Sequence, residues 1–439
     1  MKVKAIKTIK DKAPMAEFDN FSVNDDNGKE SDLICVYPDI EYQTIKGFGG
    51  AFTEASSVTL DTLDKAQRDK VLKLYFDEEE GIGYNIGRVH INSCDFSLGN
   101  YSCVEDGDMT LESFNIRRDK KSVIPMIKDA MKYNDIGVFA SPWSPPAYMK
   151  TNGQMNHGGK LKKEFFELWS EFYVKFIEEY KKEGIDVWGI TVQNEPKATQ
   201  RWDSCVYTAE EERDFVKNYL GNKMKQLGIK VMFWDHNKER VIDRARVMLD
   251  DKDVEDMVSG IAYHWYSGDH FEQLEMFHKM YPDKDIVFSE GCYEYSRGME
   301  DTVRIGEKYA HDMIGNFNNY SNMFCDWNLI LDEKGGPNHV GNFCDAPIMI
   351  NTKKGEIDIH DSYYYIGHFS KYVKKGAKRI GCSKWTDELE TVFFKNPDGD
   401  VVGIVLNRTE DDRKICFKMD GKLVESVAEA RSIATYIFS

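Results

Sequence analysis

The chain has 439 residues, about three times the length of a typical domain, although a single barrel can take up about 250 residues. A composition that is 41% hydrophobic and 13% aromatic excludes a disordered chain. The net charge of -17 disfavours nucleic acid and anionic membrane surfaces as partners. We therefore expect a neutral small molecule as the ligand and no stable membrane association; the oligomeric state is not predicted.

The N-terminal segment and the cysteines bear on the compartment. Residues 1–20 carry lysines but no apolar run of the length that a signal peptide needs. The nine cysteines are scattered and form no CxxC pair, which is typical of reduced thiols. The sequence therefore predicts a cytoplasmic protein with neither a disulfide framework nor a zinc site.

Eight short β-rich runs alternate with longer segments of helical period, a pattern typical of βα units around a parallel sheet. The runs are Ile45–Thr53, Tyr84–Asn92, Ile136–Trp143, Val187–Glu195, Ile229–His236, Ile261–Tyr266, Ile286–Glu290 and Met323–Ile330. An aromatic stripe from Phe165 to Tyr180 recurs at three- and four-residue steps, as on one face of a helix. Eight such units predict a closed (β/α)8 TIM barrel.

Beyond Lys384 the pattern changes to strands alone, predicted at 389–396, 401–408, 414–419 and 433–438. The dipeptide Asp398-Gly399 marks a hairpin turn, and residues 33–37 form another strand that has no covering helix. Because chain ends often meet at the surface, we expect both ends to build one small β-sandwich. The predicted division is residues 1–43 for the N-terminal sandwich strands, 44–375 for the catalytic barrel and 376–439 for the C-terminal sandwich strands.

Polar and aromatic side chains gather at the carboxyl ends of the predicted barrel strands, where enzymes of this fold place their chemistry. They are Arg88, His90, Asp95, Trp143, Asn194, Glu195, Asp235, His236, His264, Tyr266, Glu290, Asp326, Trp327 and Asn328. A barrel with a purely structural role would more often carry hydroxyls, glycine and ordinary surface charges at this rim. The sequence therefore predicts an active site here.

Two carboxylates, Glu195 and Glu290, each end a hydrophobic run, the fourth and the seventh, which lie across the barrel mouth from one another. Glycoside hydrolysis uses such a pair, one as the proton donor and one to meet the oxocarbenium-like carbon. At a separation of about 5 Å the second can act as a nucleophile, with retention of configuration. The sugar would lie against the flat faces of Trp143, Tyr266 and Trp327 and hydrogen-bond to Asp95 and Asn194.

Two other classes of function remain as alternatives. His90, His236, His264 and Asp235 raise the possibility of a metal-dependent hydrolase on the same barrel. That class would have paired histidines on the first strand, where GFGGAFTEAS has none, and no HExxH motif occurs. A sugar-binding barrel without catalysis would share the aromatics but lack one of the two glutamates. We therefore expect an enzyme with no metal and no cofactor.

Eight segments along almost the whole chain have a distinctive sequence. They are GFGGAFTEAS, GIGYNIGRVHINSCDFS, ASPWSPPAYMKTNG, TVQNEP, HWY, SEGC, DWNLILDEKGGPNHVGNFCDAPI and VVGIVLNR. In kind and order they are similar to segments of glycoside hydrolase family 30, and within it of the glucosylceramidases. The resemblance implies a TIM barrel with a β-sandwich made from both chain ends, and a retaining β-glycosidase acting on β-glucosides.

The resemblance also implies roles for individual residues. Glu195 of NEP corresponds to the acid/base and Glu290 of SEG to the nucleophile. Arg88 and Tyr266 would position the nucleophile. The residues implied for the glucose subsite are Asp95, Trp143, Asn194, Tyr266, Trp327 and Asn342.

Two positions depart from the family pattern. Tyr148 and His339 stand where lysosomal members of the family carry tryptophan, and both positions would lie near the aglycone. Acceptance of a ceramide tail is therefore open, and β-xylosides, short β-glucan or xylo-oligosaccharide fragments and plant glucosides are alternative substrates.

Overall fold

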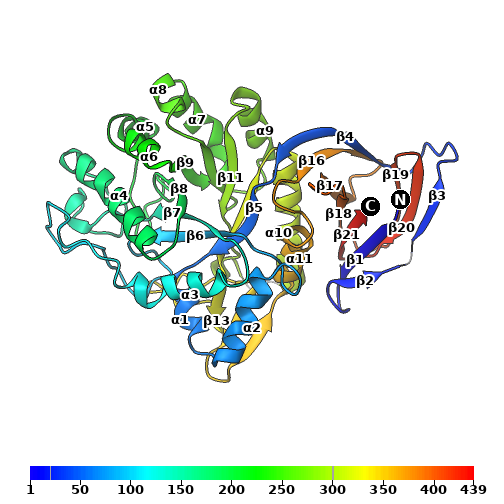
Figure 1. Cartoon of the computed structure of the whole chain (residues 1–439), viewed down its shortest axis with the longest axis horizontal. Helices are drawn as coiled ribbons and strands as arrows, with labels where there is room; N and C mark the ends of the chain where they lie inside the picture. The colour runs from blue at the N-terminus through cyan, green and yellow to red at the C-terminus, as the bar shows by residue number, and fades with distance from the viewer. Residues whose placement is uncertain (20, 299–300) are drawn as a thin grey trace.

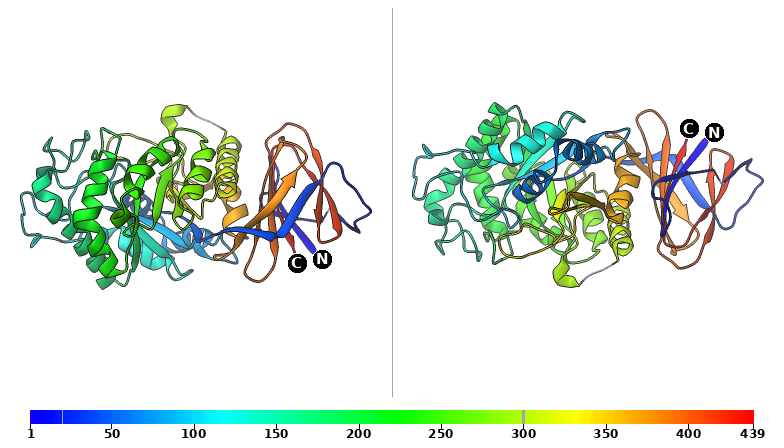
Figure 2. Two further views of the ribbon diagram at one scale, coloured as in Figure 1. Left: turned by 90° about the horizontal axis from the view of Figure 1, so that it is seen from above. Right: turned by 90° about the horizontal axis from the view of Figure 1, so that it is seen from below.

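The computed structural model describes residues 1–439 except 20 and 299–300, and it consists of a barrel beside a β-sandwich (Figure 1). Both chain termini lie in the sandwich, in all three views (Figure 2). Among the helices of the described residues, none combines the length and the apolar character needed to cross a bilayer.

The barrel is a closed ring of eight parallel strands in the order β5-β6-β7-β8-β9-β10-β11-β12. Their bounds are β5 (Gly47–Ala51), β6 (Ile86–Ile91), β7 (Gly137–Pro142), β8 (Val187–Thr191), β9 (Lys230–Asn237), β10 (Gly260–His264), β11 (Asp285–Glu290) and β12 (Met323–Asn328). Each strand overlaps one of the eight predicted runs, so the prediction of a TIM barrel is confirmed.

The α-helices surround the barrel strands. They are α1 (Glu54–Leu60), α2 (Lys65–Phe76), α3 (Val123–Ala130), α4 (Phe166–Lys182), α5 (Ala209–Phe215), α6 (Gly221–Leu227), α7 (Val241–Leu249), α8 (Lys252–Glu255), α9 (Phe271–Met280), α10 (Thr302–Asn318) and α11 (Asp361–Ser370). The predicted aromatic stripe lies on α4, where Trp169, Phe172 and Tyr180 are fully buried. Helix packing on the sheet thus accounts for these aromatics, which take no part in the site.

The sandwich is one hydrogen-bonded sheet in the order β2-β1-β21-β18-β17-β16-β4-β19-β20-β3, folded on itself. Its strands are β1 (Val3–Ile9), β2 (Ala16–Phe18), β3 (Ser22–Asp25), β4 (Ile34–Thr44), β16 (Lys378–Lys384), β17 (Leu389–Lys395), β18 (Val401–Asn407), β19 (Arg413–Met419), β20 (Lys422–Ala428) and β21 (Ser432–Phe438). β1 pairs with β21 along its whole length, so the two chain ends meet as expected.

Helices α10 and α11 join the sandwich to the barrel. Arg431 of the sandwich forms an ion pair of 2.6 Å with Glu307 on α10. The buried ring of His368 on α11 lies 2.9 Å from the hydroxyl of Thr8 and 2.8 Å from that of Thr435. These polar contacts connect both ends of the chain to the barrel. A separate small sheet, β13 (Ile330–Asp332), β14 (Ile348–Asn351) and β15 (Glu356–Ile359), follows the last barrel strand.

Candidate active site

The backbone is strained where the barrel strands β8 and β9 end. Glu195, just after β8, has a φ of 46°, and Asp235 in β9 has a φ of 51°, both in the left-handed region. The Glu195 N–H donates to the Asp235 carbonyl over 2.9 Å, which joins the two segments. Such geometry costs about 1–3 kcal/mol at a residue other than glycine and is concentrated at functional sites.

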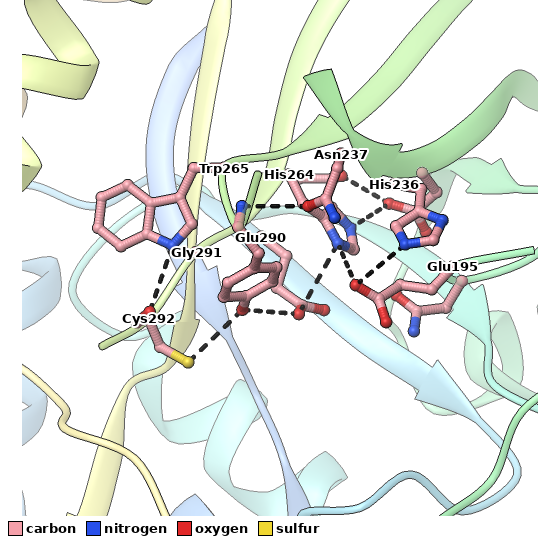
Figure 3. Close-up of polar contacts among 12 residues, drawn as sticks. Glu195, His236, Asn237, His264, Trp265, Glu290, Gly291 and Cys292 are labelled. Carbon is pink, nitrogen blue, oxygen red and sulfur yellow. Dashed lines mark hydrogen bonds and ion pairs between the residues drawn. The ribbon is translucent and has the colours of Figure 1, made fainter. Parts of the chain in front are cut away.

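Glu195 and Glu290 lie on either side of the His264 ring (Figure 3). His264 Nδ1 is 3.2 Å from Glu195 Oε1 and 3.9 Å from Glu290 Oε1. One carboxylate oxygen of each glutamate and one His264 nitrogen all lie within 4.8 Å of one another. The predicted pair of carboxylates is therefore brought together, with an imidazole between them.

Arg88 lies beneath the pair and is fully buried. Its guanidinium donates to Glu290 Oε2 over 2.5 Å and to Asp235 Oδ2 over 2.8 Å. It also donates to the Asn194 side-chain oxygen over 2.9 Å and to the Ser141 hydroxyl over 3.1 Å. One cation thus compensates two buried carboxylates and fixes the orientation of Glu290.

The second oxygen of Glu290 is held from the other side. Tyr266, just after β10, donates its hydroxyl to Glu290 Oε1 over 2.9 Å. The Cys292 sulfur lies 3.5 Å from the same tyrosine oxygen. Glu290 is thereby fixed at both oxygens by Arg88 and Tyr266, in agreement with the positions that the resemblance implies for these two residues.

The two glutamates have unequal surroundings, and their pKa values shift in opposite directions. Burial raises the pKa of Glu290, and this effect exceeds the opposing effects of His264 and Arg88. Burial also acts to raise the pKa of Glu195, but the neighbouring His236 and His264 rings outweigh it, and the pKa lies below its usual value. The two carboxyl groups therefore differ in their electrostatic surroundings.

His264 is protonated at neutral pH. Burial acts to lower its pKa, but Glu290, Asp235 and Glu195 together raise the pKa to about 9. Its Nε2 lies 3.0 Å from Asp235 Oδ1, so the ring faces carboxylate oxygens at both nitrogens. Glu195, His264 and Glu290 each place one ligand atom within 4.8 Å of the others, so their spacing alone would allow a metal ion.

A cavity of about 250 Å³ opens above the two glutamates. Seven other predicted residues line it: Asp95, Trp143, Asn194, His236, Tyr266, Trp327 and Asn342. Arg88 does not line the cavity because it lies below its floor. Neither Tyr148 nor His339 is among the lining residues; the Tyr148 hydroxyl donates to the Asp108 carbonyl instead.

Trp143 and Trp327 form one wall of the cavity and stack on each other. Their ring centroids are 5.1 Å apart and their planes differ by 15°. The Arg88 guanidinium lies 4.7 Å from the centroid of Trp143. One face of each indole is thus covered by the other indole. The apolar surface available to a ligand is therefore smaller than predicted from the sequence, in which each ring was expected to present an open face.

Asp95 closes the far end of the cavity. Burial and the charge of Glu290 raise the pKa of its carboxyl group to about 8. The side-chain amides of Asn338 and Asn342 both donate to Asp95 Oδ2, each over 3.3 Å. Because Oδ2 already accepts two hydrogen bonds, the other oxygen of Asp95 is the one left for a ligand.

Several residues that line the cavity were not predicted from the sequence. They are Gln200, Trp202, Asn237, Cys292, Glu294, Arg297 and Cys344. Asp235 and His264 were predicted at the rim and considered as metal ligands, whereas in the structure they form a hydrogen-bonded link between Arg88 and Glu195. Their place at the ends of barrel strands could be predicted, since both follow apolar stretches, but their contacts could not.

Two family models match the chain in succession. The TIM-barrel domain of glycosyl hydrolase family 30 matches residues 45–373, and the β-sandwich domain of the same family matches residues 376–436.

Relatives of known identity agree with these matches. The lysosomal acid glucosylceramidase of Mus musculus is 35% identical, with 92% of this chain and 83% of the relative covered. The crystal structure of SrfJ from Salmonella typhimurium superposes with a TM-score of 0.96 at 37% identity, covering 100% of this chain and 99% of that one. An endo-β-1,6-glucanase structure superposes with a TM-score of 0.91 at 28% identity, covering 100% and 99%. With the paired glutamates on the barrel and both domains matched, the chain belongs to glycosyl hydrolase family 30.

Proposed function

We propose that this glycosidase is a retaining β-glucosidase that works through a covalent glycosyl-enzyme intermediate. The observation that carries the proposal is the approach of Glu195 and Glu290, whose nearest oxygens lie within 4.8 Å of each other. Retaining enzymes hold their two carboxyl groups about 5–5.5 Å apart, whereas inverting enzymes need about 6.5–9.5 Å to admit a water molecule. The close approach of the two oxygens therefore favours the shorter, retaining separation.

Glu290 serves as the nucleophile in this proposal. Donors at both of its oxygens, Arg88 and Tyr266, stabilise the ionised form and keep its orientation fixed. Among the described residues, Glu195 has no arginine at its carboxylate and faces the His264 ring instead. Its side chain is 13% exposed to the cavity, where a leaving group would lie. It therefore serves as the acid and then as the base.

His264 supplies the proton that Glu195 needs. Its Nδ1 lies 3.2 Å from Glu195 Oε1 and, in this proposal, donates to that oxygen before the sugar binds. A bound sugar excludes water, and a lower dielectric favours transfer of this proton, which leaves neutral imidazole beside neutral Glu195. Glu195 then protonates the glycosidic oxygen while Glu290 attacks the anomeric carbon and the bond to the leaving group breaks. In the second step Glu195 takes a proton from water, the water oxygen attacks the anomeric carbon and the bond to Glu290 breaks, which releases the sugar. Glu195 returns the proton to His264 as the sugar leaves.

The size of the cavity supports a single sugar ring in the deep part of the site. The cavity volume of about 250 Å³ lies below the range of about 300–1,000 Å³ that is typical of pockets for drug-sized ligands. Two relatives carry the names lysosomal acid glucosylceramidase and endo-1,6-β-D-glucanase. Both names refer to a substrate that contains a glucosyl unit. Glucose is therefore the sugar that we propose for this position.

The rim of the cavity favours a polar aglycone as a second candidate. Among the residues that line it, Gln200, Asn237, Glu294 and Arg297 offer hydrogen-bonding groups, and Trp202 adds an aromatic surface. Such a rim suits a second sugar better than an alkyl chain. A short β-glucan fragment is thus a candidate beside glucosylceramide, and hydrolysis of a soluble glucose disaccharide compared with that of a glucosylated lipid would distinguish them.

Replacing Asp95 by Ala is expected to lower kcat/KM for an aryl β-glucoside about ten- to a hundredfold. In this proposal the free oxygen of Asp95 binds the 4- and 6-hydroxyls of glucose. Because the pKa of Asp95 is raised to about 8, its carboxyl group is mainly neutral at neutral pH, and two hydrogen bonds of about 0.5–1.5 kcal/mol each account for the loss. An aryl β-xyloside lacks the hydroxymethyl group and should lose much less. The measurement is the ratio of the two specificity constants before and after the substitution, and an unchanged ratio would remove the residue-level support for glucose.

Exhaustive dialysis against a chelator is expected to leave activity unchanged. In the proposed mechanism Glu195, Glu290 and His264 handle the proton and the sugar without a metal. Initial rates before and after dialysis, with and without added zinc or manganese, check this. A loss of activity that either ion restores would favour the metal-dependent hydrolase.

A further inference from the structure

His339 makes contacts that the proposed mechanism does not use. Its Nδ1 lies 3.1 Å from the Ser97 carbonyl oxygen. Its Nε2 lies 3.5 Å from Asp203 Oδ2, and the two side chains are only 10% and 0% exposed. Neither Nε2 nor Oδ2 has a hydrogen-bond partner elsewhere in the described part of the chain.

Asp203 offers His339 one oxygen that no other group of the described residues uses. Asp203 Oδ1 already accepts from the Ser93 hydroxyl over 2.6 Å and from the Asn100 amide over 2.9 Å. Only Oδ2 of this buried carboxylate is left, and His339 Nε2 lies 3.5 Å from it.

His339 and its neighbour Asn338 connect the 338–342 loop to the segment that follows β6. The His339 N–H donates to the Asp95 carbonyl over 3.3 Å, and its neighbour Asn338 donates its side-chain amide to Asp95 Oδ2. The Asn338 side-chain oxygen accepts from the backbone N–H of Val340 and of Asn342, which closes the loop on itself. A change at His339 therefore reaches the cavity through Asn338 and Asn342, the two amides that hold Asp95.

We propose that His339, bridging Ser97 and Asp203, is a positioning residue that fixes the 338–342 loop so that Asp95 reads the 4- and 6-hydroxyl edge of the sugar. This role rests on the proposed function, because it acts through the binding of glucose by Asp95. His339 itself touches no reacting atom. Its contribution should appear in the selection of the sugar and not in the chemical step.

The test compares two variants that are close to histidine in size. His339→Leu fills the space but donates no hydrogen bond, whereas His339→Gln keeps a donor that can reach Asp203. For an aryl β-glucoside we expect His339→Leu to raise KM about tenfold and to change kcat less than about twofold. His339→Gln should bring KM most of the way back to the wild-type value. For an aryl β-xyloside, KM and kcat of both variants should stay within about twofold of the wild-type values. His278→Ala, which removes a half-buried histidine stacked on Tyr320, is the control and should change neither substrate.

Equal changes for the glucoside and the xyloside, or no change for either, would overturn the positioning role. If His339→Leu does not fold, His339→Gln still decides the question: it lacks the Ser97 contact, so the part of the loss that it does not recover should raise the glucoside KM while the xyloside constants hold. Asp95→Ala is measured in parallel. If Asp95→Ala affects the glucoside more than the xyloside while the His339 variants affect both equally, only the positioning role fails. If Asp95→Ala affects both sugars equally, the glucose proposal and the role of His339 fail together.

Discussion

Replacing Glu290 or Glu195 by Gln is expected to reduce turnover of a natural-type substrate by about 10⁴-fold or more while leaving the fold intact. Each substitution removes one of two roles that no neighbouring group can take over. The two variants should differ with an activated aryl β-glucoside, because its leaving group needs little proton donation. In Glu195→Gln the first step should survive and azide should restore release of the sugar, as a β-glycosyl azide.

The assignment of the two roles is checked by the same experiment. Pre-steady-state release of the aryl group should show a burst in Glu195→Gln and none in Glu290→Gln. Glu294→Gln, at the rim of the same cavity, is the control and should retain most of its turnover. If azide rescued Glu290→Gln with formation of a β-glycosyl azide, and Glu195→Gln with formation of an α-glycosyl azide, the two roles would be reversed.

Replacing Arg88 by Met is expected to lower the free energy of unfolding by about 3–5 kcal/mol and to abolish most activity. The guanidinium is the cation between Glu290 and Asp235, both buried, and its removal leaves two carboxylates without compensation. Arg88→Lys should recover only part of the stability, because one ammonium cannot reach the partners that the planar fork spans. Urea unfolding followed by tryptophan fluorescence measures the effect.

A matched control for Arg88 exists on the surface. Arg240 forms an ion pair with Asp243, and the two side chains are 54% and 67% exposed. Arg240→Met should cost less than about 1 kcal/mol, since exposed pairs contribute little. Equal losses for the Arg88 and Arg240 variants would show that the buried network does not stabilise the barrel.

The barrel could be predicted from the sequence because its signals are local. Each barrel strand is a short apolar run, and α4 carries its own aromatic stripe. The sandwich was only partly predictable: β1, β2, β3, β16 and β20 were not identified one by one. β1 contains two lysines in seven residues, and one of them, Lys7, is buried beside Glu429 near the other end of the chain. Such pairing across the sequence gives a strand no local signature.

The candidate site was predictable in its members but not in its internal contacts. Glu195, Glu290 and the lining residues follow from a simple rule, namely that they end barrel strands. That Asp235 and His264 connect Arg88 to Glu195 depends on side-chain direction within the barrel, and the stacking of Trp143 on Trp327 depends on the spacing between strands. Neither is encoded in residue spacing along the chain.

The stereochemistry of the first product tests the account most directly. Proton NMR during the first minutes of hydrolysis of an aryl β-glucoside distinguishes the α- and β-anomers of the released glucose before mutarotation mixes them. The close approach of Glu195 and Glu290 predicts β-glucose as the first product, by two successive inversions at the anomeric carbon. Appearance of α-glucose first would contradict a nucleophilic Glu290 and require a water molecule between the two carboxylates.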